Sequence, residues 1–109
     1  MEKIVLQDIP AKGLPLYELR RLFTASGSFT DMSFSLITLL PGQRVPETGD
    51  GCHEEDEYSF FLEGEVYTVS GDYTGVCGAG EGTLIPRGER HWCENRTDKP
   101  CRLVCVMLK

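Results

Sequence analysis

The side chains best suited to chemistry are the two histidines of the chain, His53 and His91. Glu57 follows His53 by four residues, so an imidazole and a carboxylate lie close together where a strand is expected to begin. His91 follows a turn at residues 86–88, in which proline fixes φ and glycine takes positive φ without a side-chain cost. Neutral imidazole is a common metal ligand, and here one is held just past a rigid corner.

The residues after this turn are expected to form a strand. Its alternation places His91, Cys93 and Asn95 on one face and Trp92 on the other. Cys93 therefore either lines the same interior as His91 or acts as a small apolar filler. We expect Trp92, and Tyr58 by the same alternation, to contact the other sheet, the N-terminal segment or a partner subunit.

The elements that must position these residues are short strands. Twelve glycines and six prolines interrupt the apolar runs at intervals of about ten residues, which is typical of an all-β sandwich or barrel. Residues 14–24 also fit helical spacing over two turns, but they lead into a Ser-Gly-Ser turn and are predicted as a strand. The predicted strands are residues 3–6, 14–24, 30–40, 57–62, 65–69, 73–77, 83–85, 91–95 and 101–108.

A chain of 109 residues forms one domain with room for a single pocket. The net charge of -6 and the scattered lysines and arginines argue against a nucleic-acid partner. The first ten residues lack the pattern of a secretory signal, and no apolar run approaches membrane-spanning length, so we expect a cytoplasmic protein without a membrane partner.

The five cysteines have no paired spacing and are odd in number, which favours reduced thiols over a disulfide framework. A disulfide stays the weaker alternative. Packing roles are expected for three of them, Cys77, Cys101 and Cys105.

Alternation from Glu57 places Ser59 and Phe61 inside the barrel, and Phe34 or Leu36 is expected to join them from a neighbouring strand. Such a pocket is small, mostly apolar and suited to a compact organic molecule.

Three arginines on the loops, Arg44, Arg87 and Arg90, are expected near the mouth of this pocket. They would either pair with a substrate carboxylate or only increase solubility.

Two spacing patterns resemble the signatures of the cupin family. The second cupin signature is matched at five positions, Gly80, Pro86, Gly88, His91 and Asn95. Most of the first signature is matched by His53, Glu57 and Gly64, and a Pro-Gly turn at residues 41–42 falls where cupins usually place one. The resemblance covers about residues 30–108.

This resemblance implies a double-stranded jelly-roll barrel, often dimeric, with a divalent metal held by three histidines and one glutamate. Carried over by position, His53 is the second histidine, Glu57 the glutamate and His91 the third histidine. The domain would span residues 1–109, with the signatures within 41–95 and strands of residues 1–40 completing the barrel or a dimer interface.

The first histidine of the family is missing. In the alignment that keeps His53, its place is taken by Gly51, which has no ligand atom. Cupins also tolerate one more residue before the glutamate, and in that register Asp50 and Cys52 take the two histidine places. Both alignments leave Cys52 close to the site.

Two histidines and one carboxylate form a facial triad that suits iron(II) and leaves positions open for substrate or oxygen; zinc or manganese would also accept it. A Cys52 thiolate as fourth ligand would favour zinc or iron.

The fold alone does not define the reaction. The first hypothesis is a metal-dependent enzyme or binder of a small organic molecule, such as an iron dioxygenase, an isomerase or a lyase. The second is a ligand-binding or sensory cupin without catalysis, in which the metal site is degenerate. The third is that Cys52 and Cys93 act as redox-responsive thiols. Strands that are apolar on both faces further favour a homodimer.

Overall fold

The computed structural model describes residues 5–13, 17–24 and 31–109 of the chain. Its elements are short and almost all extended. They are η1 Leu6–Asp8, β1 Lys12–Gly13, β2 Glu18–Thr24, β3 Met32–Leu39, β4 Arg44–Val45, β5 Asp56–Glu63, β6 Glu65–Ser70, β7 Tyr73–Gly78, β8 Gly82–Ile85, β9 His91–Glu94 and β10 Cys101–Leu108.

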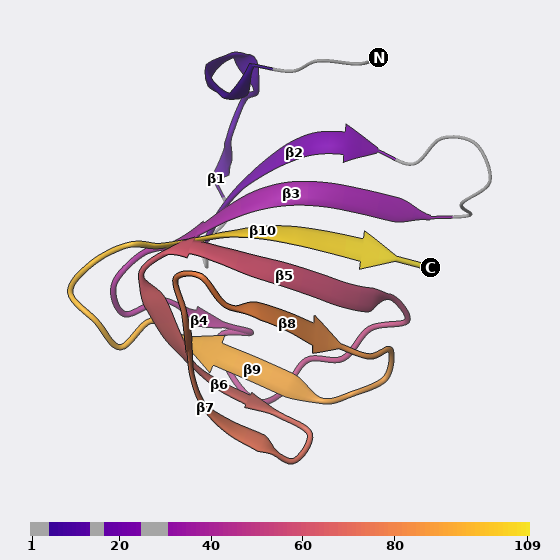
Figure 1. The fold of residues 1–109 in the computed structure, drawn as a ribbon, viewed down its shortest axis with the longest axis vertical. Coiled ribbons are helices and arrows are strands. Elements are labelled where there is room, and N and C mark those ends of the chain that lie inside the picture. The colour runs from indigo at the N-terminus through magenta and orange to yellow at the C-terminus, as the bar shows by residue number, and fades with distance from the viewer. Residues whose placement is uncertain (1–4, 14–16, 25–30) are drawn as a thin grey trace.

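The strands form two antiparallel sheets that face each other (Figure 1). The larger sheet has the order β1-β2-β3-β10-β5-β8, and the smaller has the order β4-β9-β6-β7. Strands distant in sequence are neighbours in both sheets, so the architecture is the all-β jelly roll that the sequence predicts.

Strand β10 lies in the middle of the larger sheet. It pairs along its whole length with β3 and, through one bulge after Arg102, with β5. Leu103, Cys105 and Met107 face the interior between the sheets, whereas Val104 and Val106 belong to the outer face. This central place explains why the strand is apolar on both faces.

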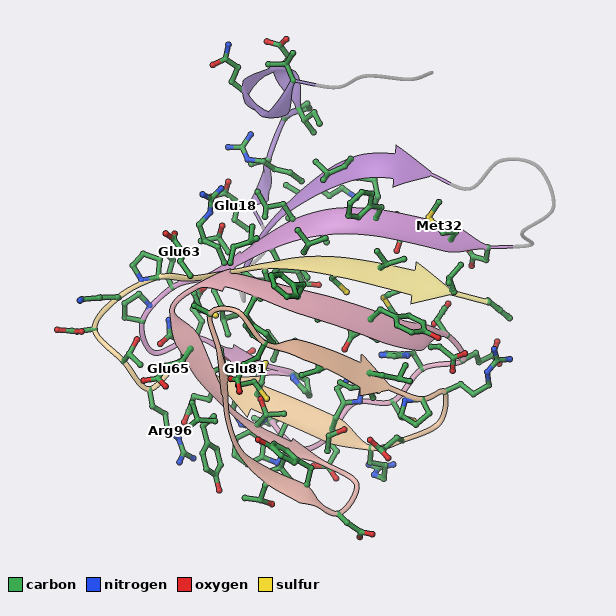
Figure 2. All side chains as sticks on the ribbon, viewed as in Figure 1. Glu18, Met32, Glu63, Glu65, Glu81 and Arg96 are labelled. Carbon is green, nitrogen blue, oxygen red and sulfur yellow. The ribbon has the colours of Figure 1, made fainter. Side chains whose placement is uncertain are left out.

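The best-buried apolar side chains form one cluster between the sheets: Leu39, Phe61, Val66, Cys77 and Cys101. Phe61 and Val66 flank the turn between β5 and β6, so the cluster lies toward the end of the barrel where Figure 2 shows Glu63 and Glu65. Met32 is labelled at the opposite end of the barrel. The interior thus has a filled end and an end that is free for a site.

Asn95, the last residue of the second cupin-like signature, is fully buried. Its amide nitrogen donates to the carbonyls of Leu39 and Lys99 at 2.9 and 2.8 Å, and its oxygen accepts from the amide and hydroxyl of Thr97 at 3.0 and 2.7 Å. One side chain therefore joins the end of β3 to the turn between β9 and β10, which accounts for an asparagine at this position.

The predicted strands from residue 30 onward are all present, with ends that differ by one or two residues. The segment 43–52, which contains none of the predicted strands, contains the short strand β4. Residues 18–24 form a strand as predicted; residues 14–16 of that prediction lie outside the described part.

The strand predicted at residues 3–6 is wrong where the structure describes it, because Val5 is in no strand and Leu6 begins a 3-10 turn. The Asp8 amide closes that turn by donating a hydrogen bond of 3.0 Å to the carbonyl of Val5. Within the described residues no helix is long and apolar enough to cross a membrane.

Candidate metal centre

Three side chains from separate parts of the sequence converge at the free end of the barrel. Each of His53, Glu57 and His91 offers one ligand atom, and these atoms all lie within 4.8 Å of one another. His53 lies in the loop before β5, Glu57 is the second residue of β5, and His91 begins β9 in the other sheet. We call these three residues the His-Glu-His group. It joins the two sheets at one point.

The tautomers of both histidines follow from their hydrogen bonds. The Nδ1 atom of His53 lies 2.9 Å from the carbonyl oxygen of Glu55, and Nδ1 of His91 lies 2.9 Å from that of Glu89. A carbonyl oxygen only accepts, so Nδ1 donates in both rings, and in the neutral form of each ring Nε2 keeps its lone pair. This is the second-shell arrangement that orients histidines toward a metal.

Nε2 of His53 has no hydrogen-bond partner among the residues that the structure describes. It is buried, and Oε1 of Glu57 is 3.9 Å away. A buried acceptor without a partner costs free energy unless something else binds it. Ligand bonds of about 2.1 Å place two donors on one ion no more than about 4.2 Å apart, so a modest inward movement would close the group on a cation. The residues present therefore fit a divalent metal.

Backbone hydrogen bonds hold the segments that carry the two histidines. The amides of Gly51 and His91 each donate to the carbonyl of the other at 2.9 Å, and the Gly88 amide donates to the carbonyl of His53 at 2.8 Å. Gly88 has φ of +79°, as the proline-glycine turn predicts. The rings of His53 and His91 meet edge to face with centroids 4.9 Å apart.

The interior next to this group is a cavity of about 580 Å³. Glu57 and His91 contribute to its lining, and His53 approaches the group from outside the lining. Near the group the cavity is lined by both polar and apolar side chains, among them Met107 and Ile85, and the apolar cluster contributes Leu39, Phe61 and Val66 at the far end. An ion bound by the group would therefore border a space large enough for a small organic molecule.

A comparison with protein families identifies residues 35–107 as a cupin domain. The chain belongs to the cupin family. No match was found among curated proteins.

Solved structures show the same fold as this cupin over nearly its whole length. The polyketide cyclase RemF from Streptomyces resistomycificus has a TM-score of 0.80 and 24% identity, covering 99% of this chain and 79% of that one. A predicted oxalate decarboxylase from Thermotoga maritima has a TM-score of 0.81 and 19% identity, covering 98% of each chain. The protein TT1209 from Thermus thermophilus has a TM-score of 0.71 and 26% identity, covering 99% of this chain and 97% of that one.

Most of the residues that the sequence places inside this cupin do line the cavity, namely Ser59, Phe61 and Cys93. The prediction for Phe34 or Leu36 is wrong. Strand β3 contributes its odd-numbered residues, Ser33, Ser35, Ile37 and Leu39, so alternation directs the even-numbered ones to the outer face. The residues of β3 that face the cavity near the site are the serines Ser33 and Ser35. A prediction that assigns apolar residues to the interior therefore chooses the opposite face of this strand.

Cys52 is exposed and does not belong to the His-Glu-His group. The group instead contains His53, which corresponds to the alignment that puts Gly51 in the place of the missing histidine. The nearest atoms to a Cβ on Gly51 would belong to Pro46 and to the His91 carbonyl, at 3.7 Å or more, so a Cβ atom would fit at this position.

Cys105 is expected from the sequence only to pack, yet it is a neighbour of the candidate metal centre. Its sulfur lies 3.6 Å from Oε1 of Glu57, and it lines the cavity. Burial raises the pKa of this thiol to about 12, with the negative charge of Glu57 adding to the rise. The sequence does contain a signal for the position of Cys105. Strand alternation puts Cys105 on the same face of β10 as Met107, and this face is directed to the interior.

The three arginines expected at the mouth of the pocket are engaged elsewhere. Arg87 pairs with Asp56 at 3.2 Å, and Arg90 pairs with Asp50 at 3.3 Å. Arg44 lies over the Trp92 ring at 4.2 Å on the outer face of the smaller sheet. None of these three arginines lines the cavity.

The aromatic residues predicted on the opposite faces have different surroundings. Trp92 contacts Tyr67 of its own sheet, with ring centroids 5.6 Å apart, rather than the other sheet. Tyr58 is 44% exposed on the outer face of the larger sheet.

Proposed function

We propose that His53, Glu57 and His91 hold a divalent transition metal, and that this cupin binds a small organic molecule in the cavity beside it. The observation that carries the proposal is the pair of Nε2 lone pairs gathered beside one carboxylate, with both Nδ1 atoms committed to carbonyls. When bound, iron(II), manganese or zinc would act as a Lewis acid toward an organic oxygen, and iron would also bind dioxygen. The protein residues orient the ligand and limit the access of water to it.

Metal uptake tests this proposal directly. Protein stripped with a chelator is dialysed against iron(II), manganese or zinc, and its metal content is measured by elemental analysis. We expect one equivalent for the parent chain and less than about a tenth for His91→Ala or Glu57→Gln. Glu55→Gln is the matched control, because it removes a nearby carboxylate but keeps the carbonyl that orients His53. Equal uptake by Glu57→Gln and the parent would refute the ligand set.

The enzymatic version of this function is favoured by the three-ligand arrangement, which leaves coordination positions open beside the cavity. An oxygen-dependent reaction on iron is its most specific form. The alternative is a sensory cupin that binds its ligand without turnover, and the missing fourth ligand at Gly51 supports it. Metal content separates the two. An enzyme should keep its ion through purification, whereas less than about a tenth of an equivalent would favour the sensor.

We further propose that a second copy of the chain covers the outer face of the larger sheet. Four large side chains there are 44% to 54% exposed, and they come from the neighbouring strands β5 and β8: Tyr58, Phe60, Leu62 and Leu84. Adjacent exposed apolar side chains of this size are typical of a protein interface. A cytoplasmic location stays a prediction from composition.

A further inference from the structure

One row of directly opposed residues crosses the inner face of the larger sheet beside the candidate metal centre. The pairings between neighbouring strands place five polar or weakly polar side chains in this row: Arg21, Ser35, Cys105, Ser59 and Thr83. All of them line the cavity. We call this set the polar row.

The polar row lies between two rows of different character. Toward the filled end of the barrel the next row is apolar and consists of Leu19, Ile37, Leu103 and Phe61. Toward the free end the next row contains Glu57 of the His-Glu-His group between Met107 and Ile85. The cavity wall therefore has a polar row between an apolar row and the row that carries Glu57, and these differences would orient a bound molecule.

Arg21 is the one cation of the polar row, and it differs from the other arginines of the chain. Each of the others has a carboxylate, carbonyl or aromatic partner: Arg20, Arg44, Arg87, Arg90, Arg96 and Arg102. Within residues 5–13, 17–24 and 31–109, the Arg21 side chain makes no hydrogen bond or ion pair. Its guanidinium thus keeps all its donors available at the cavity wall.

The position of Arg21 also suits a molecule that reaches the metal centre. Strand β2 lies three strands from β5, which corresponds to roughly 14 Å between their backbones. Arg21, which is exposed, and Glu57 both line the cavity, and the positive charge of Arg21 acts on Cys105, which lies between them. The space left between the two ends fits a small molecule rather than a polymer.

We infer that Arg21 binds the carboxylate of a small organic acid whose apolar part lies over the apolar row and whose other polar end faces the His-Glu-His group. Guanidinium matches a carboxylate with two parallel hydrogen bonds, and Ser35, directly opposite Arg21, can donate a third. This inference rests on the proposed function for its reacting end, but the carboxylate contact itself requires no metal.

The test compares acids with their uncharged amides. The probes are 3-phenylpropanoate with 3-phenylpropanamide, and hexanoate with hexanamide, with affinities measured by calorimetry and by amide chemical shifts. The proteins are the parent chain, Arg21→Gln, Arg21→Lys and Arg102→Gln, each in chelator-treated and zinc-loaded form. Arg102→Gln is the matched control, because it makes the same charge change on the outer face of the same sheet.

We expect the parent to bind each acid about tenfold or more tightly than its amide, Arg21→Gln to lose this preference, and Arg21→Lys to keep part of it. Arg102→Gln should match the parent, and amide binding should be the same in all four proteins. The inference is overturned by equal affinity of parent for acid and amide, by a preference that survives Arg21→Gln, or by absence of acid binding at millimolar concentration. The preference for acid over amide is also measured without metal. A failure to take up metal would therefore refute the proposed function, and the test of the Arg21 contact would still be valid.

Discussion

The backbone amide of Gly88 donates a hydrogen bond of 2.8 Å to the carbonyl of His53, so the turn that precedes one candidate ligand also holds the other. A backbone hydrogen bond thus joins the two signatures of the family without any contribution from a metal. Gly88 has φ of +79°, a conformation that costs any other residue about 1–2 kcal/mol.

Replacing Gly88 by alanine should therefore weaken metal binding by about tenfold, because strain in the turn shifts the carbonyl contact to His53. Gly80→Ala is the control. Gly80 has φ of +85°, and for both glycines a Cβ atom would have no neighbour within 4 Å. Both variants should lose about 1–2 kcal/mol in urea unfolding, and only Gly88→Ala should lose metal affinity in a zinc titration. Equal zinc affinities would show that the turn does not position His53.

Gly64, between β5 and β6, should be far less tolerant of substitution than Gly80. Its φ is +75°, and a Cβ atom would lie 2.4 Å from the carbonyl oxygen of Pro100 and 2.8 Å from Cα of Cys101. These are backbone atoms that cannot rotate away. We expect Gly64→Ala to cost about 1–3 kcal/mol more than Gly80→Ala in urea unfolding. A difference under about 0.5 kcal/mol would mean that the turn relaxes freely.

One of the five cysteine thiols should be reactive, and the other four should be protected by the fold. Cys52 is exposed, whereas burial raises the pKa of Cys93 to about 12 and that of Cys101 to about 11. Thiolate is the reactive form, so a disulfide reagent at about pH 8 should modify about one thiol per native chain. Cys52→Ser should remove this fast phase. Fast modification of Cys93 in the Cys52→Ser variant would contradict this prediction and support the hypothesis that Cys93 is a redox-responsive thiol.

Stability should fall in alkaline solution because of the buried thiols. The pKa of Cys93, Cys101 and Cys105 is raised by folding, so above the ordinary value of about 9 the unfolded chain binds fewer protons than the native one, and each rise in pH favours unfolding. The window opens near pH 9 and extends to about 11–12. Each thiol should cost on the order of 1 kcal/mol by about pH 10. Urea midpoints at several pH values measure this, and Cys93→Ala should show a shallower decline than the parent.

Substitutions that introduce a charge on the outer face of the larger sheet should dissociate the proposed dimer. Phe60→Asp and Leu84→Asp place a carboxylate at positions that are 49% and 54% exposed in the single chain. We expect light scattering to give twice the chain mass for the parent and the chain mass for these variants. Val76→Asp, at a residue 50% exposed on the other sheet, should leave the mass unchanged. A parent that is monomeric at all concentrations would refute the interface.

The fold and the convergence of the His-Glu-His group were predictable from sequence for one physical reason. Turn residues with special φ values mark the strand ends, and His53, Glu57 and His91 lie at fixed distances from such turns. The parity of β5 was also predictable, because alternation from Glu57 directs Ser59 and Phe61 to the interior.

The parity of β3 and the place of Arg21 at the cavity wall could not be obtained in the same way. The wall of a ligand cavity carries serines where a packed core would carry leucines, so hydrophobic alternation selects Phe34 and misses Ser35. Arg21 lies in a segment whose spacing also suits a helix, and its direction depends on the register between β2 and β3. The absence of a strand at residues 5 and 6 likewise reflects the tertiary context. A short apolar segment forms a strand only where a neighbouring strand pairs with its backbone.

The stacking of Arg44 on Trp92 gives this cupin a built-in optical signal. Trp92 is the sole indole of the chain, and it follows His91 directly. Any shift of that backbone when an ion or an acid enters the barrel would move the fluorophore against its guanidinium neighbour and change its emission. Occupancy of the interior could therefore be followed from the unlabelled protein by fluorescence alone.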